Sequence, residues 1–260
     1  MIVNDIINII ESAAPLRWQE EWDNSGLQVG NRNADIKKVL LTTDVTESVV
    51  SEAIATGCQM IVSHHPLLFH GLKQLCGQTP AARCVETAIK NGIAIYSAHT
   101  SMDSWLHGVS GEMAERVGLR EYTILTPAAN ASEAENYGLG VIGSLPETMA
   151  FEALLERVKQ AFGAPALRYI PAVTDKVKRV ALCGGAGSEF MDDAIAQGAD
   201  VFITADVKYH TFLDAVGRIG IIDIDHWISE HFVRDVFQRL LNGHVETVIA
   251  KNDYSPVKIY

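Results

Sequence analysis

The chain has 260 residues, of which 48% are hydrophobic and 20% are charged, as in a globular protein with one large domain or two moderate ones. Its 21 basic and 32 acidic residues give a net charge of −11, and no basic cluster occurs in the sequence. This charge argues against binding to nucleic acids and to anionic membranes, because both carry negative charge.

The beginning of the chain and its cysteines both predict a cytoplasmic protein. The first fourteen residues include Asp5 and Glu11 but no Lys or Arg, so they lack the features of a signal peptide. No apolar run is long enough to span a membrane. The cysteines show no CxxC spacing, which favours free reduced thiols over a zinc ribbon. They are Cys58, Cys76, Cys84 and Cys183.

Apolar spacing predicts a βαβ unit in the first quarter of the chain. An amphipathic helix over 3–13, with Asn4 as its N-cap, comes first. A strand over 38–43, a helix over 47–55 and a strand over 60–63 then follow one another. The last of these strands is a continuous apolar run, which predicts that it is buried.

A loop with two tryptophans precedes this unit. Trp18 and Trp22 lie there beside Asp23-Asn24-Ser25-Gly26, whose side chains are typical of turns. Two tryptophans and an acid in one loop indicate that the loop packs over another part of the molecule. We interpret both tryptophans, and Trp227 near the end of the chain, as packing or lid residues rather than stacking platforms.

The middle of the chain predicts further helices and strands. A helix over 80–91, a strand over 93–97 and a short helix over 111–117 come first. The polar stretch 126–137 has no clear period and is interpreted as a linker or an exposed loop. The remaining predictions are a strand over 139–143, a helix over 148–162 and a strand over 166–170.

The later half of the chain repeats the earlier one. Residues 36–65 align without a gap with residues 177–206, with seven identities in thirty. Residues 88–103 and 215–230 both contain a helix end, an apolar strand and a His-x-x-x-acid motif. Duplication explains both matches, and shared βαβ patterning is the alternative. We therefore predict an α/β fold of two similar units.

Two adjacent histidines, His64 and His65, follow the strand over 60–63 and precede Pro66. The carboxyl ends of parallel strands line the crevice where α/β proteins bind ligands. Neighbouring strand residues point to opposite faces, so the two rings either converge through a backbone turn or serve two metal ions. As a dipeptide alone, the pair is equally consistent with polar loop residues.

Three further segments place metal-binding types of side chain just after predicted strands. Imidazole and carboxylate groups together suit zinc, iron or manganese. Because the groups recur at corresponding points of the two units, we predict a metal site. The segments contain His99 and Asp103, then Asp206 and His210, then Asp225, His226 and Glu230.

Six motifs in the same order resemble the Nif-three-like family, whose members are also labelled GTP cyclohydrolase 1 type 2 homologues. The resemblance extends over essentially the whole chain. The motifs are Trp22-Asp23-Asn24-Ser25-Gly26-Leu27, Ser63-His64-His65-Pro66-Leu67, His99-Thr100-Ser101-Met102-Asp103, Ala181-Leu182-Cys183-Gly184-Gly185, Thr204-Ala205-Asp206-Val207-Lys208-Tyr209-His210 and His226-Trp227-Ile228-Ser229-Glu230.

The resemblance implies a cytoplasmic homohexamer whose chains each hold two divalent metal ions, zinc, iron or manganese, in a cleft between two α/β lobes. We expect the lobes to span 1–125 and 126–260, with 205–260 returning to the shared metal site. His99 and His210 are expected next to the ligands or in the substrate pocket. By position, the ligands of one ion are His64, Asp103 and Glu230, and those of the other are His65 and His226, with Glu230 bridging.

A paired-metal site predicts a hydrolase of a small, anionic, phosphorylated or nucleotide-like molecule. The resemblance implies an activity similar to that of GTP cyclohydrolase 1 type 2. His99, Asp206 and His210 are the candidates for general acid or base. The alternative is a metal carrier or a regulatory protein without enzymatic activity.

A glycine-rich segment, Cys183-Gly184-Gly185-Ala186-Gly187-Ser188, lies between a predicted strand and a helix. Its backbone N–H groups are placed to cradle a phosphate. It matches neither the dinucleotide fingerprint nor the P-loop, so close-packed turn glycines are at least as good an explanation.

Overall fold

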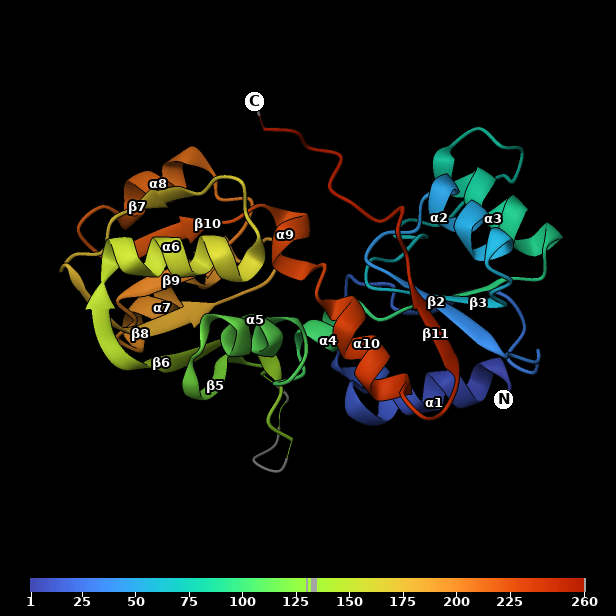
Figure 1. Cartoon of the computed structure of the whole chain (residues 1–260), viewed down its shortest axis with the longest axis horizontal. Helices are drawn as coiled ribbons and strands as arrows, with labels where there is room; N and C mark the ends of the chain where they lie inside the picture. The colour runs from blue at the N-terminus through green and yellow to red at the C-terminus, as the bar shows by residue number, and fades with distance from the viewer. Residues whose placement is uncertain (130, 132–134, 260) are drawn as a thin grey trace. The chain divides into compact units, whose positions relative to one another are not determined.

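The computed structural model describes residues 1–129, 131 and 135–259. They form two compact units, each built around its own β-sheet (Figure 1). Unit 1 comprises residues 1–102 and 233–254, and unit 2 comprises residues 103–232 and those after 254. This mixed architecture of two similar α/β units confirms the predicted fold class.

Unit 1 contains a five-stranded sheet of order β1-β4-β3-β2-β11. The four strands from β4 to β11 run parallel, and β1 pairs with β4 antiparallel at one edge. The strands are β1 (Gly26–Val29), β2 (Lys38–Thr42), β3 (Met60–Ser63), β4 (Ala94–Ser97) and β11 (Glu246–Ile249). The helices are α1 (Val3–Ala13), the 3-10 turn η1 (Leu16–Trp18), α2 (Glu47–Ala55), α3 (Pro80–Lys90) and α10 (Val233–Leu241), and α4 (Thr100–Asp103) ends at the first residue of unit 2.

Helices cover both faces of this sheet (Figure 1). On one face, α2 and α3 pack on each other and bury Leu40, Ile61 and Ile95 of the central strands. On the other face, α1 and α10 contact each other, and their Ile6 and Phe237 are fully buried. Because both faces are covered, β2 and β3 are buried along almost their whole length.

Side-chain caps fix where these helices begin. Thr46 Oγ1 accepts a hydrogen bond from Val49 N at the start of α2. The expected N-cap of α1 was wrong, because Ile2 occupies that position rather than Asn4. Asp5 in the first turn accepts the hydrogen bond from Ile2 N at 2.9 Å, which satisfies the end of the helix without a capping Asn.

Unit 2 contains a six-stranded sheet of order β5-β6-β8-β9-β10-β7. Strands β8, β9 and β10 are parallel, and the outer pairings are antiparallel. The strands are β5 (Arg120–Pro127), β6 (Gly138–Ala150), β7 (Arg168–Ile170), β8 (Lys176–Leu182), β9 (Val201–Thr204) and β10 (Gly220–Asp223). The helices are α5 (Val109–Val117), α6 (Phe151–Phe162), the 3-10 turn η2 (Ser188–Phe190), α7 (Met191–Ala196), α8 (Tyr209–Ala215) and α9 (His226–Glu230).

Two hydrophobic cores lie on the two faces of this sheet. Strand β9 contributes Val201 and Ile203 to the core under α5 and α6, and Phe202 to the core that includes residues of α7 and α8. The alternation follows from the two-residue period of a strand, which sends successive side chains to opposite faces.

The two sheets share a topology, as the sequence repeat predicts. The offset of the alignment carries β3 onto β9 residue for residue, and it carries α2 onto η2 and α7. The edge strands agree as well, since β1 pairs antiparallel with β4 and β7 pairs antiparallel with β10. The sheets differ at the other edge, where β11 is parallel to β2 but β6 is antiparallel to β8, and where β5 adds a sixth strand to the sheet of unit 2.

Several boundaries differ from those expected. The units separate at 102/103 and 232/233 rather than at 125/126, because β11 pairs with β2 and residues 233–254 belong to unit 1. Helix α6 begins at Phe151 rather than at 148, since residues 148–150 still belong to β6. The stretch expected as a linker lies partly outside the described residues, and its first two residues end β5. Within the described part of the chain, the helices are too short or too polar to cross a membrane.

Candidate functional site

The adjacent histidines of unit 1 lie directly beyond the carboxyl end of β3. His64 N and His65 N donate to Thr42 O and Thr43 O, which continues the pairing with β2 past Ser63. The two ring centroids are 4.9 Å apart with their planes tilted by 43°. The rings therefore lie side by side instead of pointing to opposite faces of the sheet, as a regular strand would require.

The Nδ1 atom of each of these rings lies within hydrogen-bond distance of an oxygen atom. His64 Nδ1 lies 3.0 Å from Ala98 O, and His65 Nδ1 lies 2.9 Å from Asp44 Oδ1. A carbonyl oxygen only accepts hydrogen bonds, so His64 carries its proton on Nδ1 when neutral. The lone pair is then on Nε2, which is the arrangement of a metal-binding histidine supported by an oxygen acceptor.

His99 joins the pair from the segment after β4. Its ring centroid lies 5.2 Å from that of His64 and 5.4 Å from that of His65. Each of the three histidines offers a ring nitrogen, and these three nitrogens lie within 4.8 Å of one another. His99 Nδ1 is also held by a carboxylate, Asp23 Oδ1, at 2.9 Å. Unit 1 thus gathers three imidazoles that can bind a metal ion.

Asp23 is a fully buried carboxylate that organises this region. Its second oxygen accepts from Thr100 N, Thr100 Oγ1 and Ser25 Oγ at 3.0, 2.6 and 2.7 Å. Burial alone would raise the pKa of Asp23, but the hydrogen bonds from His99, Thr100 and Ser25 outweigh it and hold the pKa well below its usual range. Asp23 is therefore ionised at neutral pH and fixes the orientation of His99.

We expect Asp23→Asn to destabilise metal-free protein at pH 7 by about 1.5–3 kcal/mol, because hydrogen bonds to a charged group are lost. The folded-state pKa is depressed, so this stabilisation is complete above the unfolded pKa of about 3.9 and is lost as pH falls through the folded pKa. Urea unfolding of wild type and variant at several pH values measures it. Asp35→Asn, at an exposed carboxylate of the same unit, is the control. A wild-type to variant gap that does not narrow in acid would contradict this assignment.

In unit 2, helix α9 presents a histidine and a glutamate one turn apart. Asp225 caps this helix by accepting from Ile228 N at 3.2 Å. His226 Nε2 lies 3.0 Å from Glu230 Oε2, as expected for side chains at i and i+4. His226 Nδ1 lies 2.7 Å from Asp206 Oδ2. The Nδ1 atom of this ring thus contacts an oxygen atom, as the Nδ1 atoms of the unit 1 rings do. Its Nε2 atom lies beside the buried carboxylate of Glu230.

Backbone strain is concentrated beside this helix. Asp206 and Asp225 have φ angles of +53° and +70°, which side chains with a Cβ rarely adopt. Both follow parallel strands of the sheet, and one holds the ring of His226 while the other caps its helix. Strain of this kind is retained where the surrounding structure demands it, and it is common at functional sites.

The glycine-rich loop after β8 lies against α9. Gly185 has a φ of +61°, and a Cβ added there would overlap Glu230 Oε1 and approach Glu230 Cδ at 3.1 Å. The loop N–H groups serve hydroxyls of the protein itself: Gly184 N donates to Ser110, Gly185 N to Ser229 and Gly187 N to Thr204. This supports close-packed turn glycines over a phosphate cradle.

Both units contain predicted site residues that lie close to one another within the unit. His64, His65 and His99 lie together in unit 1, and the residues gathered in unit 2 are Asp206, His226 and Glu230. Asp103 is the last residue of α4. His210 is exposed on α8, with its ring edge-on to Tyr209 at 5.4 Å.

Sequence reasoning did not assign Asp23 and Asp44 to the site. Only their positions in the sequence could have indicated them. Asp44 follows the carboxyl end of β2, the strand next to β3, and Asp23 belongs to the loop with two tryptophans. The acidic partners of His65 and His99 were thus visible in the sequence only as loop residues.

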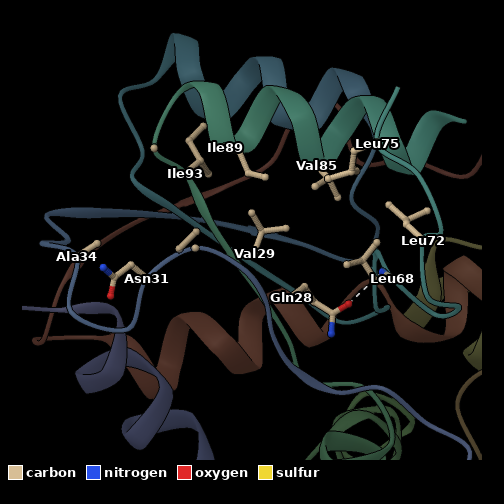
Figure 2. A pocket seen from close by; sticks show the side chains of 13 residues that line it. Gln28, Val29, Asn31, Ala34, Leu68, Leu72, Leu75, Val85, Ile89 and Ile93 are labelled. Atoms are coloured by element: carbon tan, nitrogen blue, oxygen red, sulfur yellow. Dashed lines mark hydrogen bonds between the residues drawn. The ribbon is translucent and has the colours of Figure 1, made fainter. Parts of the chain in front are cut away.

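A separate pocket of about 700 Å³ lies elsewhere in unit 1 (Figure 2). It is lined mainly by aliphatic side chains, including Val29, Leu72, Val85 and Ile89, and none of its lining residues is a His, Cys, Asp or Glu. The histidine group is therefore a different site.

Known proteins resemble the chain over its whole length. Residues 1–256 match the profile of Duf34/NIF3 (NGG1p interacting factor 3). The chain belongs to the Duf34/NIF3 family. A Clostridium perfringens protein named GTP cyclohydrolase 1 type 2 homolog is 36% identical, with 98% of each chain covered. A Clostridium acetobutylicum protein of the same name is 32% identical, again with 98% of each chain covered.

Solved structures of the family have the same fold. A Bacillus cereus protein related to NIF3 superposes with a TM-score of 0.90 at 26% identity, covering 100% of this chain and 99% of that one. The Staphylococcus aureus protein SA1388 gives the same score, identity and coverage. The resemblance found in the motifs is thus confirmed, and the chain matches these Duf34/NIF3 proteins from end to end.

Proposed function

We propose that this Duf34/NIF3 protein is a hydrolase that depends on divalent metal ions and acts on a small phosphorylated or nucleotide-like substrate. One observation carries the proposal: four imidazoles, those of His64, His65, His99 and His226, each have Nδ1 next to an oxygen atom. In each case the oxygen atom orients the ring, and this is the usual support of metal-binding histidines.

The donor set fits zinc, iron or manganese. Imidazole nitrogens and carboxylate oxygens suit these ions, whereas Mg²⁺ and Ca²⁺ prefer oxygen ligands alone. We propose that the donors of both units hold two ions, with His64, Asp103 and Glu230 on one and with His65 and His226 on the other. Glu230 would bridge them, and its nearly complete burial supports a role with a cation, because an ionised carboxylate is rarely buried without one.

Two bound ions would supply hydroxide at neutral pH and would polarise the bond to be broken. The chain's own residues set the geometry for this step. Asp44 and Asp206 orient the rings of the proposed ligands His65 and His226, and Asp23 orients the ring of His99. His99 and His210 are the proposed proton carriers. Asp206 is engaged with His226, and we propose that it positions that ring.

The first test is metal analysis of protein purified without chelators or an affinity tag. We expect about two transition-metal ions per chain. We also expect hydrolysis of at least one compound in a panel of phosphoesters and nucleotides, GTP included, with loss of activity on chelation and recovery with the same metal. Substoichiometric metal that does not rise on reconstitution would contradict the proposal and favour a regulatory protein.

The alternative, a metal carrier, differs in how it exchanges its ions. A catalytic centre retains its metals during turnover, whereas a carrier exchanges them readily. Full loading with rapid loss to a weak chelator and no hydrolysis would identify the carrier. We further propose a cytoplasmic homohexamer, which sedimentation analysis of the native protein tests.

A further inference from the structure

Two exposed aromatic rings lie beside the histidine group of unit 1. Trp22 is 59% exposed and Phe69 is 43% exposed, and their ring centroids are 5.9 Å apart. The ring centroid of His99 lies 5.9 Å from that of Trp22 and 6.4 Å from that of Phe69. The aromatic pair is therefore adjacent to the imidazoles of the proposed metal centre.

Hydrogen bonds on both sides hold this pair in place. Asp23, the residue after Trp22, is fixed by the hydrogen bonds that also orient His99. Asn24 Nδ2 donates to Leu68 O at 2.6 Å, which ties the Trp22 loop to the residue before Phe69. Leu68 N in turn donates to Gln28 Oε1 at 3.0 Å, the bond drawn in Figure 2. The two rings are thus presented on anchored backbone.

The other tryptophans of the predicted packing group differ from Trp22. Trp227 stacks on His231 at 4.3 Å and packs against the core of unit 2, and Trp18 is half-buried. Trp22 instead leaves more than half of its surface to solvent. A large ring exposed to solvent beside the histidine group is poorly explained by packing. It is well placed to bind another planar ring.

We propose that Trp22 and Phe69 bind the base of a nucleotide whose phosphate is held at the metal centre. This inference rests on the proposed function and adds to it a subsite for the base of a nucleotide-like substrate. Base stacking on an aromatic ring depends little on charge, so it tolerates the net charge of −11 and the neighbouring Glu20 and Glu21. The anionic phosphate is attracted to the bound cations.

The test compares a nucleotide with the matching sugar phosphate, which has an anomeric hydroxyl in place of the base. Guanosine 5′-monophosphate and ribose 5-phosphate are titrated by equilibrium dialysis into metal-loaded wild-type protein and into Trp22→Ala. We expect the variant to bind the nucleotide about 5- to 150-fold more weakly, the range found when one stacked base loses its aromatic partner. Its affinity for ribose 5-phosphate and its metal content should not change.

Two further variants control for ring chemistry and for folding. Trp22→Phe keeps a smaller ring and should retain most of the nucleotide affinity. Tyr169→Ala removes an aromatic side chain of unit 2 that is 51% exposed, and it should change neither affinity. Circular dichroism and metal analysis of every variant show whether fold and metal centre are intact.

The outcomes separate this inference from the proposed function. Wild-type protein that binds both probes equally well would overturn the base subsite and leave the metal-dependent hydrolase standing. Binding of neither probe would overturn both. If Trp22→Ala changes only the sedimentation coefficient, then the rings contact a second copy of the chain, and the base subsite is overturned.

Discussion

The His65→Ala and Glu230→Ala variants should each lose both metal ions and all hydrolysis while remaining folded. The reason is that, in the proposed centre, Glu230 would bind both ions and His65 would bind one of them. Elemental analysis together with circular dichroism measures the result. If either variant keeps the metal content of the wild type, the assignment of that residue is wrong. If each variant loses a different single ion, the ions are independent rather than paired.

Asp44→Asn is the matched control for His65→Ala. Asp44 accepts from His65 Nδ1 at 2.9 Å but is not itself a proposed ligand. Removing such a partner typically costs 10- to 100-fold in metal affinity rather than abolishing binding. The variant should therefore load fully at high metal concentration and lose its ions first in a competition with a chelator. Complete loss of metal would instead place Asp44 among the ligands.

The parallel strands and the repeat were predictable from local pattern. Continuous apolar runs such as residues 60–63 and the constant offset between residues 36–65 and 177–206 need no tertiary information. The histidines were predictable for a related reason. In both units they follow the ends of parallel strands, which is where α/β folds expose polar groups.

The path of the chain after α9 was not predictable in this way. The local sequence of residues 233–254 does not indicate that β11 pairs with β2, because the paired residues are far apart in the sequence. Its consequence reaches the histidine group. Asp253 accepts from Thr43 N at 2.6 Å and from Arg234 at 3.2 Å, and so it supports the turn that carries Asp44.

The hydrogen bonds that orient the histidines also depend on tertiary structure. Asp23 is distant in sequence from His99, and Asp206 is distant from His226. The motifs indicated that these acids lie near turns, but which acid contacts which ring is a property of the folded structure. Trp22 is the clearest case, since its packing role was inferred from the presence of two tryptophans and an acid in one loop, whereas its exposure is a property of the folded loop.

Gly185→Ala should remove the metal centre without changing any ligand. The new Cβ would overlap Glu230 Oε1 and lie 3.3 Å from His226 Cε1, so both side chains of α9 must shift. Metal ligation tolerates little displacement of its donors, and we expect at least a 100-fold loss of metal affinity, the upper end of the range for altered support of a ligand. Isothermal titration with zinc measures it.

Gly163→Ala separates this effect from backbone strain. Gly163 has a φ of +62°, matching the +61° of Gly185, and a Cβ there would meet nothing within 4 Å. Both variants should lose about 1–2 kcal/mol of unfolding free energy from the left-handed conformation, because that cost depends on the backbone alone. Only Gly185→Ala should also lose metal. Equal metal affinity in the two variants would show that metal binding does not depend on the positions of Glu230 and His226 beside Gly185. These two residues would then not be ligands of the proposed centre.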